Sequence, residues 1–331
     1  MRRYNDQRIS RFDLATGCRL APADRAGFLA RLAAHGRVTN ARDVPPKPTP
    51  TPEPEPEPTT VLYPFLLKVF PAWSYGLQGR GDCMAWSAMH NIDILMAVQI
   101  DLHKKSEIAH ALACIEAAYG FMRVEVYGGQ PDYSGDGGSP SAAAESVMKC
   151  GTLHRLKYDK HDLRIYDETG GRSGEYGRYG VPDVLEPTAL KHVVGDVALV
   201  TDFDTAVKML AQGRPISNAD TRNPIWTHRD NEGFGVSRWH ASHAMNYIGY
   251  RLGDRPGLLK TNTGHGNHVS GPRWPKDLPD SIANCSAWED ADVAEKVLKE
   301  EWSWVYSDYK GFPTRDLLAS SITPELLHPA L

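Results

Sequence analysis

The stretch QGRGDCMAWSAM, at residues 78–89, brings together residue types that could perform nucleophilic chemistry. Two glycines and Asp82, a good N-cap, lead into Cys83, and the apolar residues that follow predict a helix over 83–101. A thiol attacks as the thiolate, and a helix N-terminus stabilises that charge through its dipole and free N–H groups. Cys83 is therefore a candidate nucleophile, against the simpler interpretation that a lone cysteine is a small buried apolar residue.

A nucleophilic cysteine needs a base, usually a histidine, and a further group that orients the base. The best candidate base is His243, which begins a predicted strand within WHASHAMNYIGYR, residues 239–251. Asn262, in the later segment LLKTNTGHG, could orient the imidazole. His240 lies three residues before His243 and competes with it as the base.

The histidines also raise the question of a metal site. His240 and His243 form one H-x-x-H pair, His265 and His268 form another, and His228 is nearby. The glutamate that hydrolytic zinc motifs place beside such a pair is missing. Solvated loop histidines are the preferred interpretation, and we predict neither a metal nor an organic cofactor.

Taken in order, these pieces resemble the motifs of the papain-like cysteine peptidases. C-M-A-W-S-A at 83–88 is similar to the family's C-W-A-F-S-A, and a glutamine and a glycine-rich turn precede both. DGGSPSAAAESVMKCGTL, from residue 136, is similar to the family's glycine pair and following helix. HAMNYIGY at 243–250 matches H-A-V/M-x-x-V/I-G-Y in spacing, and KTNTGHG loosely matches K-N-S-W-G. The resemblance covers most of residues 73–270.

The resemblance implies a role for each candidate residue. Cys83 would be the nucleophile, and His243 would be the general base and then the acid to the leaving group. Asn262 would orient His243. The Gln78 side chain and the Cys83 backbone N–H would form the oxyanion hole, in which one donor contributes about 3 kcal/mol of transition-state stabilisation.

The resemblance also implies a substrate and a reaction. Gly137 and Gly138 would offer backbone to an extended peptide, which would bind like an added strand. The implied activity is thiol-dependent hydrolysis of peptide bonds, or of peptidoglycan amide bonds, through an acyl-enzyme. The alternative is a catalytically weak or inactive papain-like domain that serves as a structural or binding component of a larger assembly such as a virion.

The chain departs from the family pattern at several positions. Gln78 lies one residue closer to the nucleophile than is usual, and Met84 replaces the tryptophan that normally follows it. Arg80 stands near the place of a cysteine that commonly forms a disulfide. Strict register in the last motif puts Thr261 at the orienting position and Asn262 one residue later.

The pattern of the chain predicts an α+β fold, papain-like and two-lobed, with a helical lobe before a strand-rich lobe. The predicted helices cover 83–101, 106–122, 139–151 and 202–213. The predicted strands cover 214–220, 243–251 and 257–262.

Three segments are predicted along the chain. Residues 1–43 carry nine arginines against four aspartates and include a short amphipathic helix, so they are a candidate docking segment for a partner assembly. Residues 44–60, VPPKPTPTPEPEPEPTT, predict an extended polyproline tether. Residues 61–331 have globular composition and would form the papain-like domain.

Composition argues against several other classes of protein. The net charge of -4 over 331 residues argues against a nucleic-acid partner. Five widely spaced cysteines without a CxxC pair argue against a disulfide scaffold. We find no apolar run that could span a membrane and no signal peptide, and the sequence does not fix a compartment.

Overall fold

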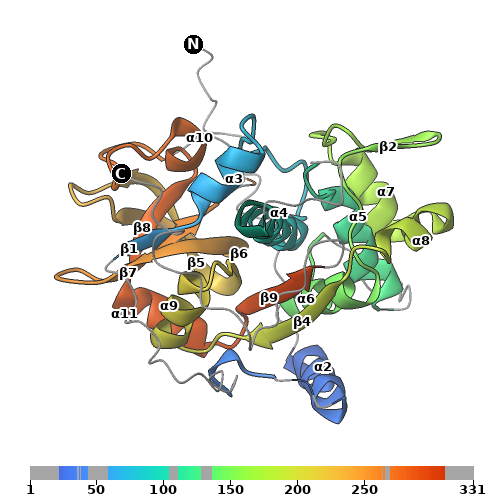
Figure 1. The fold of residues 1–331 in the computed structure, drawn as a ribbon, viewed down its shortest axis with the longest axis horizontal. Coiled ribbons are helices and arrows are strands. Elements are labelled where there is room, and N and C mark those ends of the chain that lie inside the picture. The colour runs from blue at the N-terminus through green and yellow to red at the C-terminus, as the bar shows by residue number, and fades with distance from the viewer. Residues whose placement is uncertain are drawn as a thin grey trace.

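The computed structural model describes residues 22–35, 37, 39–43, 59–103, 111–127, 136–262, 264 and 269–309. Within them the fold is α+β, which confirms the predicted class. Helices α5, α7 and α8 gather on one side of the molecule, most of the large sheet lies on the other, and α4 runs between them (Figure 1).

Helices dominate the first part of the described chain and strands dominate the second. The elements before residue 194 are α2 (Pro22–Ala34), η1 (Ala41–Asp43), β1 (Thr59–Val61), α3 (Tyr63–Val69), α4 (Cys83–His103), α5 (Ile115–Gly120), η2 (Phe121–Glu125), α6 (Pro140–Lys149), β2 (Lys157–Tyr158), β3 (His161–Asp162), α7 (Gly171–Tyr179), η3 (Asp183–Leu185) and α8 (Glu186–Ala189). Those that follow are β4 (Val194–Leu199), α9 (Phe203–Ala211), β5 (Ile216–Arg229), β6 (Gly235–Arg251), β7 (Gly257–Thr261), α10 (Asp280–Ala283), β8 (Ser286–Asp290), α11 (Ala291–Lys299) and β9 (Trp304–Tyr309).

The large sheet of the described chain is antiparallel, with strand order β4-β9-β5-β6-β7-β8 and with β1 paired to β6. Its central strand β6 begins at Gly235, eight residues before the predicted strand at His243. Pairing with β5 extends the strand, because the two stay paired, through three register shifts, as far as Arg229 and Gly235. Backbone hydrogen bonds thus hold a polar stretch that lacks the apolar alternation of a typical strand.

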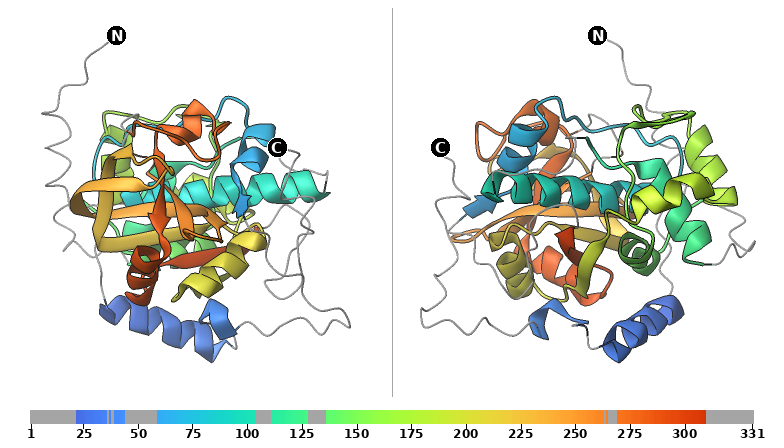
Figure 2. Two further views of the ribbon diagram at one scale, coloured as in Figure 1. Left: turned by 90° about the vertical axis from the view of Figure 1, so that its left-hand side faces the viewer. Right: turned by 45° about the vertical axis from the view of Figure 1, so that its right-hand side comes forward.

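Helix α4 is the central helix of the fold and confirms the helix predicted over 83–101. The backbone carbonyl of Asp82 accepts hydrogen bonds from the N–H groups of Ala85 and Trp86, which begins the helix at Cys83. Every residue from 83 to 100 is buried, including polar side chains such as Ser87, Asn91 and Asp93, so protein surrounds the helix on all sides. Figure 2 shows α4 running lengthwise beside the sheet.

The helix predicted over 106–122 is wrong at its start, since α5 begins at Ile115. Residues 106–110 of that prediction lie outside the described residues. The backbone N–H of Ala113 donates to Asp93 Oδ1 of α4 at 2.7 Å, and the N–H of Cys114 donates to the carbonyl of Leu153 at 2.8 Å. These tertiary contacts hold the segment extended, although its alanines favour a helix.

Asp93 gives the fold a predicted dependence on pH. Burial raises the pKa of its carboxyl to about 8, against the opposing effects of the Ala113 N–H and the charge of Arg155. An unfolded aspartate has a pKa of about 3.9, so between about pH 4 and pH 8 folding takes up a proton. The stability that this group contributes is therefore full below about pH 4 and is lost as pH rises to about 8.

We expect Asp93→Asn to remove this slope, because the amide keeps the Oδ1 acceptor and does not ionise. Urea unfolding at pH 5 and pH 8 measures the pH dependence of stability. Relative to the wild type, the free energy of unfolding of the variant should be higher at pH 8 than at pH 5. An equal difference between the two proteins at both pH values would contradict the assignment.

The N-terminal helix α2 packs on the globular domain of the same chain and lies at its lower edge in both views of Figure 2. Phe28 and Leu32 are buried, and the Phe28 ring lies 5.4 Å from that of Trp304 in β9. The guanidinium of Arg25 donates to two backbone carbonyls after α11 and lies 4.3 Å from the Trp302 ring centroid. The apolar face of this helix is therefore occupied within the chain.

The predicted tether lies mostly outside the described residues, which resume at Thr59. Thr59 and Thr60, assigned above to the tether, form β1 and pair with Arg251 and Tyr250 of β6. Strand β1 therefore includes the last two residues of the predicted tether. Among the described helices, none combines the length and apolar character that crossing a membrane requires.

Candidate active site

Cys83 is the first residue of α4 and is fully buried. Burial raises the pKa of its thiol to about 12, and the charge of Asp82 acts in the same direction. Backbone N–H groups of Ala244, Met84 and Cys83 itself oppose this by hydrogen bonding to the sulfur. A lone thiolate is therefore disfavoured here, so a reactive Cys83 would need a proton acceptor whose positive charge compensates its own.

Strand β6 packs against helix α4, and the backbone of Ala244 in this strand opposes the rise in the pKa of the Cys83 thiol. His243 directly precedes Ala244 in this strand. A second tie between α4 and β6 comes from Ser87, whose hydroxyl donates to the carbonyl of Met245 at 2.7 Å. The long helix and the central strand thus bring together the candidate nucleophile and the segment that carries the candidate base.

His243 and Asn262 are in hydrogen-bond contact. His243 Nε2 lies 2.7 Å from Asn262 Oδ1, and both side chains are buried. An amide oxygen only accepts, so this contact assigns the proton of a neutral imidazole to Nε2 and leaves Nδ1 as the basic nitrogen. The arrangement orients the ring in the form that a general base requires.

Asn262, and not Thr261, is the residue whose side chain contacts the imidazole of His243. Thr261 is the last residue of β7 and pairs with Asn246 of β6. The chain leaves the strand at Asn262, whose backbone N–H donates to the carbonyl of Cys285 at 2.7 Å. The amide side chain can therefore reach His243 from a position one residue beyond the one that strict motif register gives.

Gln78 lies in the turn before Cys83 and is buried. Its backbone N–H donates to the carbonyl of Gly264 at 2.7 Å, which joins the turn to the segment after Asn262. Its Nε2 donates to the carbonyl of Arg80 at 2.8 Å, so one of its two amide hydrogens is left for another acceptor. The structure thus brings the turn and the Asn262 segment together.

The two glycines implied as substrate contacts differ in their surroundings. Gly137 uses its backbone inside the protein: its N–H donates to Tyr119 Oη at 3.0 Å and its carbonyl accepts from Arg123 Nη1 at 2.8 Å. Gly138 lies against α4, since a Cβ there would be 3.4 Å from Met84 Cβ and 2.5 Å from Met122 Sδ. Both glycines are buried, and their part in binding a substrate stays a prediction.

A buried polar network behind His243 was not foreseen from the sequence. Lys260 Nζ donates to Glu289 Oε1 at 2.9 Å and to Asn223 Oδ1 at 2.6 Å. Asn223 Nδ2 in turn donates to the backbone carbonyl of His243 at 2.6 Å. A lysine inside the apolar strand GLLKT was the available signal, because a buried lysine is almost always paired.

The histidine pairs do not form a metal centre in the described part of the chain, where no group of three or more potential metal-ligating side chains occurs. His240 is exposed on β6 while His243 is buried. His265 and His268 lie outside the described residues. The described cysteines, Cys83, Cys114, Cys150 and Cys285, are free thiols.

Comparison with known proteins finds similarity only among solved structures, since no family model and no curated protein matches the chain. Xylellain, a cysteine protease from Xylella fastidiosa, is 15% identical, with a TM-score of 0.49 over 78% of this chain and 91% of that one. ProCathepsin B S9 from Trypanosoma congolense is 10% identical, with a TM-score of 0.42 over 83% and 87%. Digestive procathepsin L 3 of Tenebrio molitor larval midgut is 11% identical, with a TM-score of 0.37 over 81% and 79%. These are papain-like cysteine proteases, the family that the sequence motifs resemble, and the chain is similar to them.

Proposed function

We propose that this protein hydrolyses peptide bonds, or the amide bonds of peptidoglycan peptides, through a Cys83 thiolate. The observation that carries the proposal is the 2.7 Å contact between His243 Nε2 and Asn262 Oδ1, on a strand that lies against the Cys83 sulfur. It supplies an oriented base beside a thiol at the N-terminus of a 21-residue helix.

The reaction follows from these positions. His243 Nδ1 takes the proton of Cys83, and the thiolate attacks the scissile carbonyl carbon. The Cys83 N–H and Gln78 Nε2 donate to the oxyanion that forms. Collapse of this intermediate breaks the C–N bond, and the imidazolium protonates the departing amine. A water deprotonated by His243 then attacks the thioester, which releases the carboxylic acid and restores the thiol.

A second function is favoured by a different observation. Cys83 is fully buried and its thiol pKa is raised to about 12, as expected of an inert core cysteine. In that case the domain would be a structural or binding component of a larger assembly such as a virion. The state of the Cys83 thiol separates the two proposals.

The test is the rate of Cys83 alkylation by iodoacetamide as a function of pH, read by mass spectrometry at each cysteine. For the enzyme we expect labelling well below pH 7, because transfer of the proton to His243 gives a thiolate–imidazolium pair. His243→Ala should slow labelling at pH 6 by about tenfold or more. His240→Ala, an exposed residue of the same strand, is the matched control and should label like the wild type.

The opposite result is slow labelling of Cys83, with the midpoint of its pH dependence near pH 8.5 or higher and with no change in either variant. That result would exclude the hydrolase in favour of the assembly component.

A further inference from the structure

The geometry points to Tyr166 as a positioning residue that holds the turn between Gln78 and Cys83 in the shape that an oxyanion hole requires. This inference rests on the proposed hydrolase. It concerns a side chain about 80 residues away from the turn in sequence, to which no motif assigns a role.

The hydroxyl of Tyr166 joins both ends of the turn. It accepts a hydrogen bond from the N–H of Gly79 at 3.1 Å and donates one to Asp82 Oδ2 at 2.9 Å. Asp82 Oδ2 accepts a further bond from Ser173 Oγ at 2.7 Å. Asp82 is fully buried, and within the described residues its Oδ1 has no hydrogen-bond partner, so these two hydroxyls are its side-chain donors.

The turn has a particular need for such support. The papain-like peptidases that the sequence resembles usually have one more residue between this glutamine and the cysteine. They also commonly have a disulfide-bonded cysteine near the position of Arg80. Polar contacts take the place of that cross-link. Arg80 Nε donates to Asp136 Oδ1 at 2.7 Å, which ties the turn to the residue before Gly137. A Cβ on Gly79 would lie 2.3 Å from the backbone nitrogen of Gly170, so the turn is also packed tightly on the loop before α7.

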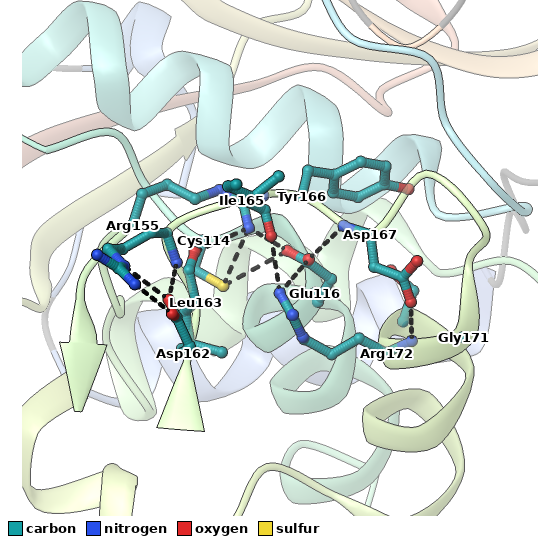
Figure 3. A network of polar contacts seen from close by, with 12 residues as sticks. Cys114, Glu116, Arg155, Asp162, Leu163, Ile165, Tyr166, Asp167, Gly171 and Arg172 are labelled. Carbon is teal, nitrogen blue, oxygen red and sulfur yellow. Dashed lines mark hydrogen bonds and ion pairs between the residues drawn. The ribbon is translucent and has the colours of Figure 1, made fainter. Parts of the chain in front are cut away.

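Tyr166 is fixed on both sides by Glu116 of α5, as Figure 3 shows. Glu116 is fully buried and pairs with Arg155 at 2.6 Å and with Arg172 at 3.0 Å. Its Oε1 also accepts the backbone N–H of Asp167 at 3.0 Å, and Arg172 donates to the carbonyl of Ile165 at 2.9 Å. The residues before and after Tyr166 are therefore anchored to α5. The Tyr166 ring packs edge-on against Trp86 of α4, with centroids 4.8 Å apart.

The chain of contacts has a specific catalytic consequence. The two proposed oxyanion donors, Gln78 Nε2 and the Cys83 N–H, lie at the two ends of the turn that Tyr166 spans. A small displacement of the turn would weaken bonds made to the oxyanion in the transition state and would hardly change substrate binding. The effect should therefore appear in kcat and not in KM.

The test is Tyr166→Phe, which keeps the ring against Trp86 and removes only the hydroxyl. The matched control is Tyr158→Phe, another half-buried tyrosine, whose hydroxyl binds the backbone N–H and carbonyl of His154 away from the turn. Three measurements apply to the full chain: kcat and KM on casein peptides, iodoacetamide labelling of Cys83, and amide hydrogen exchange of peptides that cover residues 78–83.

For Tyr166→Phe we expect kcat to fall about 10- to 100-fold with KM within about twofold, since loss of a whole oxyanion donor costs about 10²–10³ in kcat. The rate of amide hydrogen exchange in residues 78–83 should rise about tenfold or more. The rate of Cys83 alkylation should change by less than about threefold, because alkylation forms no oxyanion. Tyr158→Phe should match the wild type in all three.

The inference is overturned if Tyr166→Phe and Tyr158→Phe give the same kcat and the same exchange in the turn. It is also overturned if Tyr166→Phe raises KM while kcat stays constant. Failure of the proposed function looks different, because the wild type itself would then neither cleave casein peptides nor label at Cys83. Hydrogen exchange alone would still decide whether Tyr166 holds the turn.

Discussion

Replacing Cys83 with alanine should abolish peptide hydrolysis, with kcat falling by roughly 10⁴- to 10⁶-fold. The sulfur is the only atom of the proposed site that forms a bond to the substrate. Without it, His243 and the oxyanion donors can at most assist direct attack by water, which is far slower. Progress curves on the best peptide substrate, with the wild type at matched concentration, measure the loss.

Cys285→Ala provides the control for this experiment. Cys285 is also fully buried and free, and its thiol donates to the backbone carbonyls of Ser281 and Ile282. Both variants remove one buried sulfur, so their thermal stabilities should drop by a similar amount of about 1–2 kcal/mol. Only Cys83→Ala should lose activity. Activity that survives in Cys83→Ala, or that falls equally in both variants, would remove Cys83 from the chemistry.

The parts of this site that could be predicted from sequence are those with local signals. Asp82 followed by an apolar run marks the start of α4, and therefore places Cys83 at a helix N-terminus. Asp202 marks α9 and caps it, since its side chain accepts the N–H of Thr205 at 2.8 Å, whereas the Asp82 side chain accepts from Tyr166 and Ser173 and not from its helix. In both cases the residues that determine the element lie within a few positions of it.

The parts that could not be predicted depend on contacts between distant segments. Ala113 is held extended by Asp93, twenty residues away, against the helical preference of its neighbours. Asn262 rather than Thr261 meets His243 because β7 ends at Thr261, and the register with β6 shifts between Tyr247 and Gly249. Such a shift arises from strand pairing and leaves no trace in a single motif.

Tyr166 belongs to the same class of residue. No sequence motif singles it out, and the role proposed for it depends on the anchoring of residues 165 and 167 by Glu116 of α5. Loop positions of this kind are fixed by tertiary hydrogen bonds, so their roles become visible only when the partners are placed in space.

The largest effect on stability is expected from Lys260→Met, which should lower the free energy of unfolding by about 3–5 kcal/mol. Burial lowers the pKa of Lys260, and the charge of Glu289 opposes that shift. Both side chains are almost fully buried, and Glu289 also accepts a hydrogen bond from Tyr247. Removal of the ammonium leaves a carboxylate in the core without its counter-charge, which costs far more than the net value of the pair. Urea unfolding measures the change.

The surface pair Lys299–Glu295 is the matched control, because Lys299→Met removes an exposed ion pair and should cost less than about 1 kcal/mol. The double variant Lys260→Met with Glu289→Leu should recover much of the loss, since it leaves no unpaired charge. It should not recover catalysis, because Asn223 loses the ammonium that holds its Oδ1, and Asn223 Nδ2 supports the carbonyl of His243. Stability restored together with full activity would show that the network serves only the fold. Stability restored without activity would show that it also positions the base.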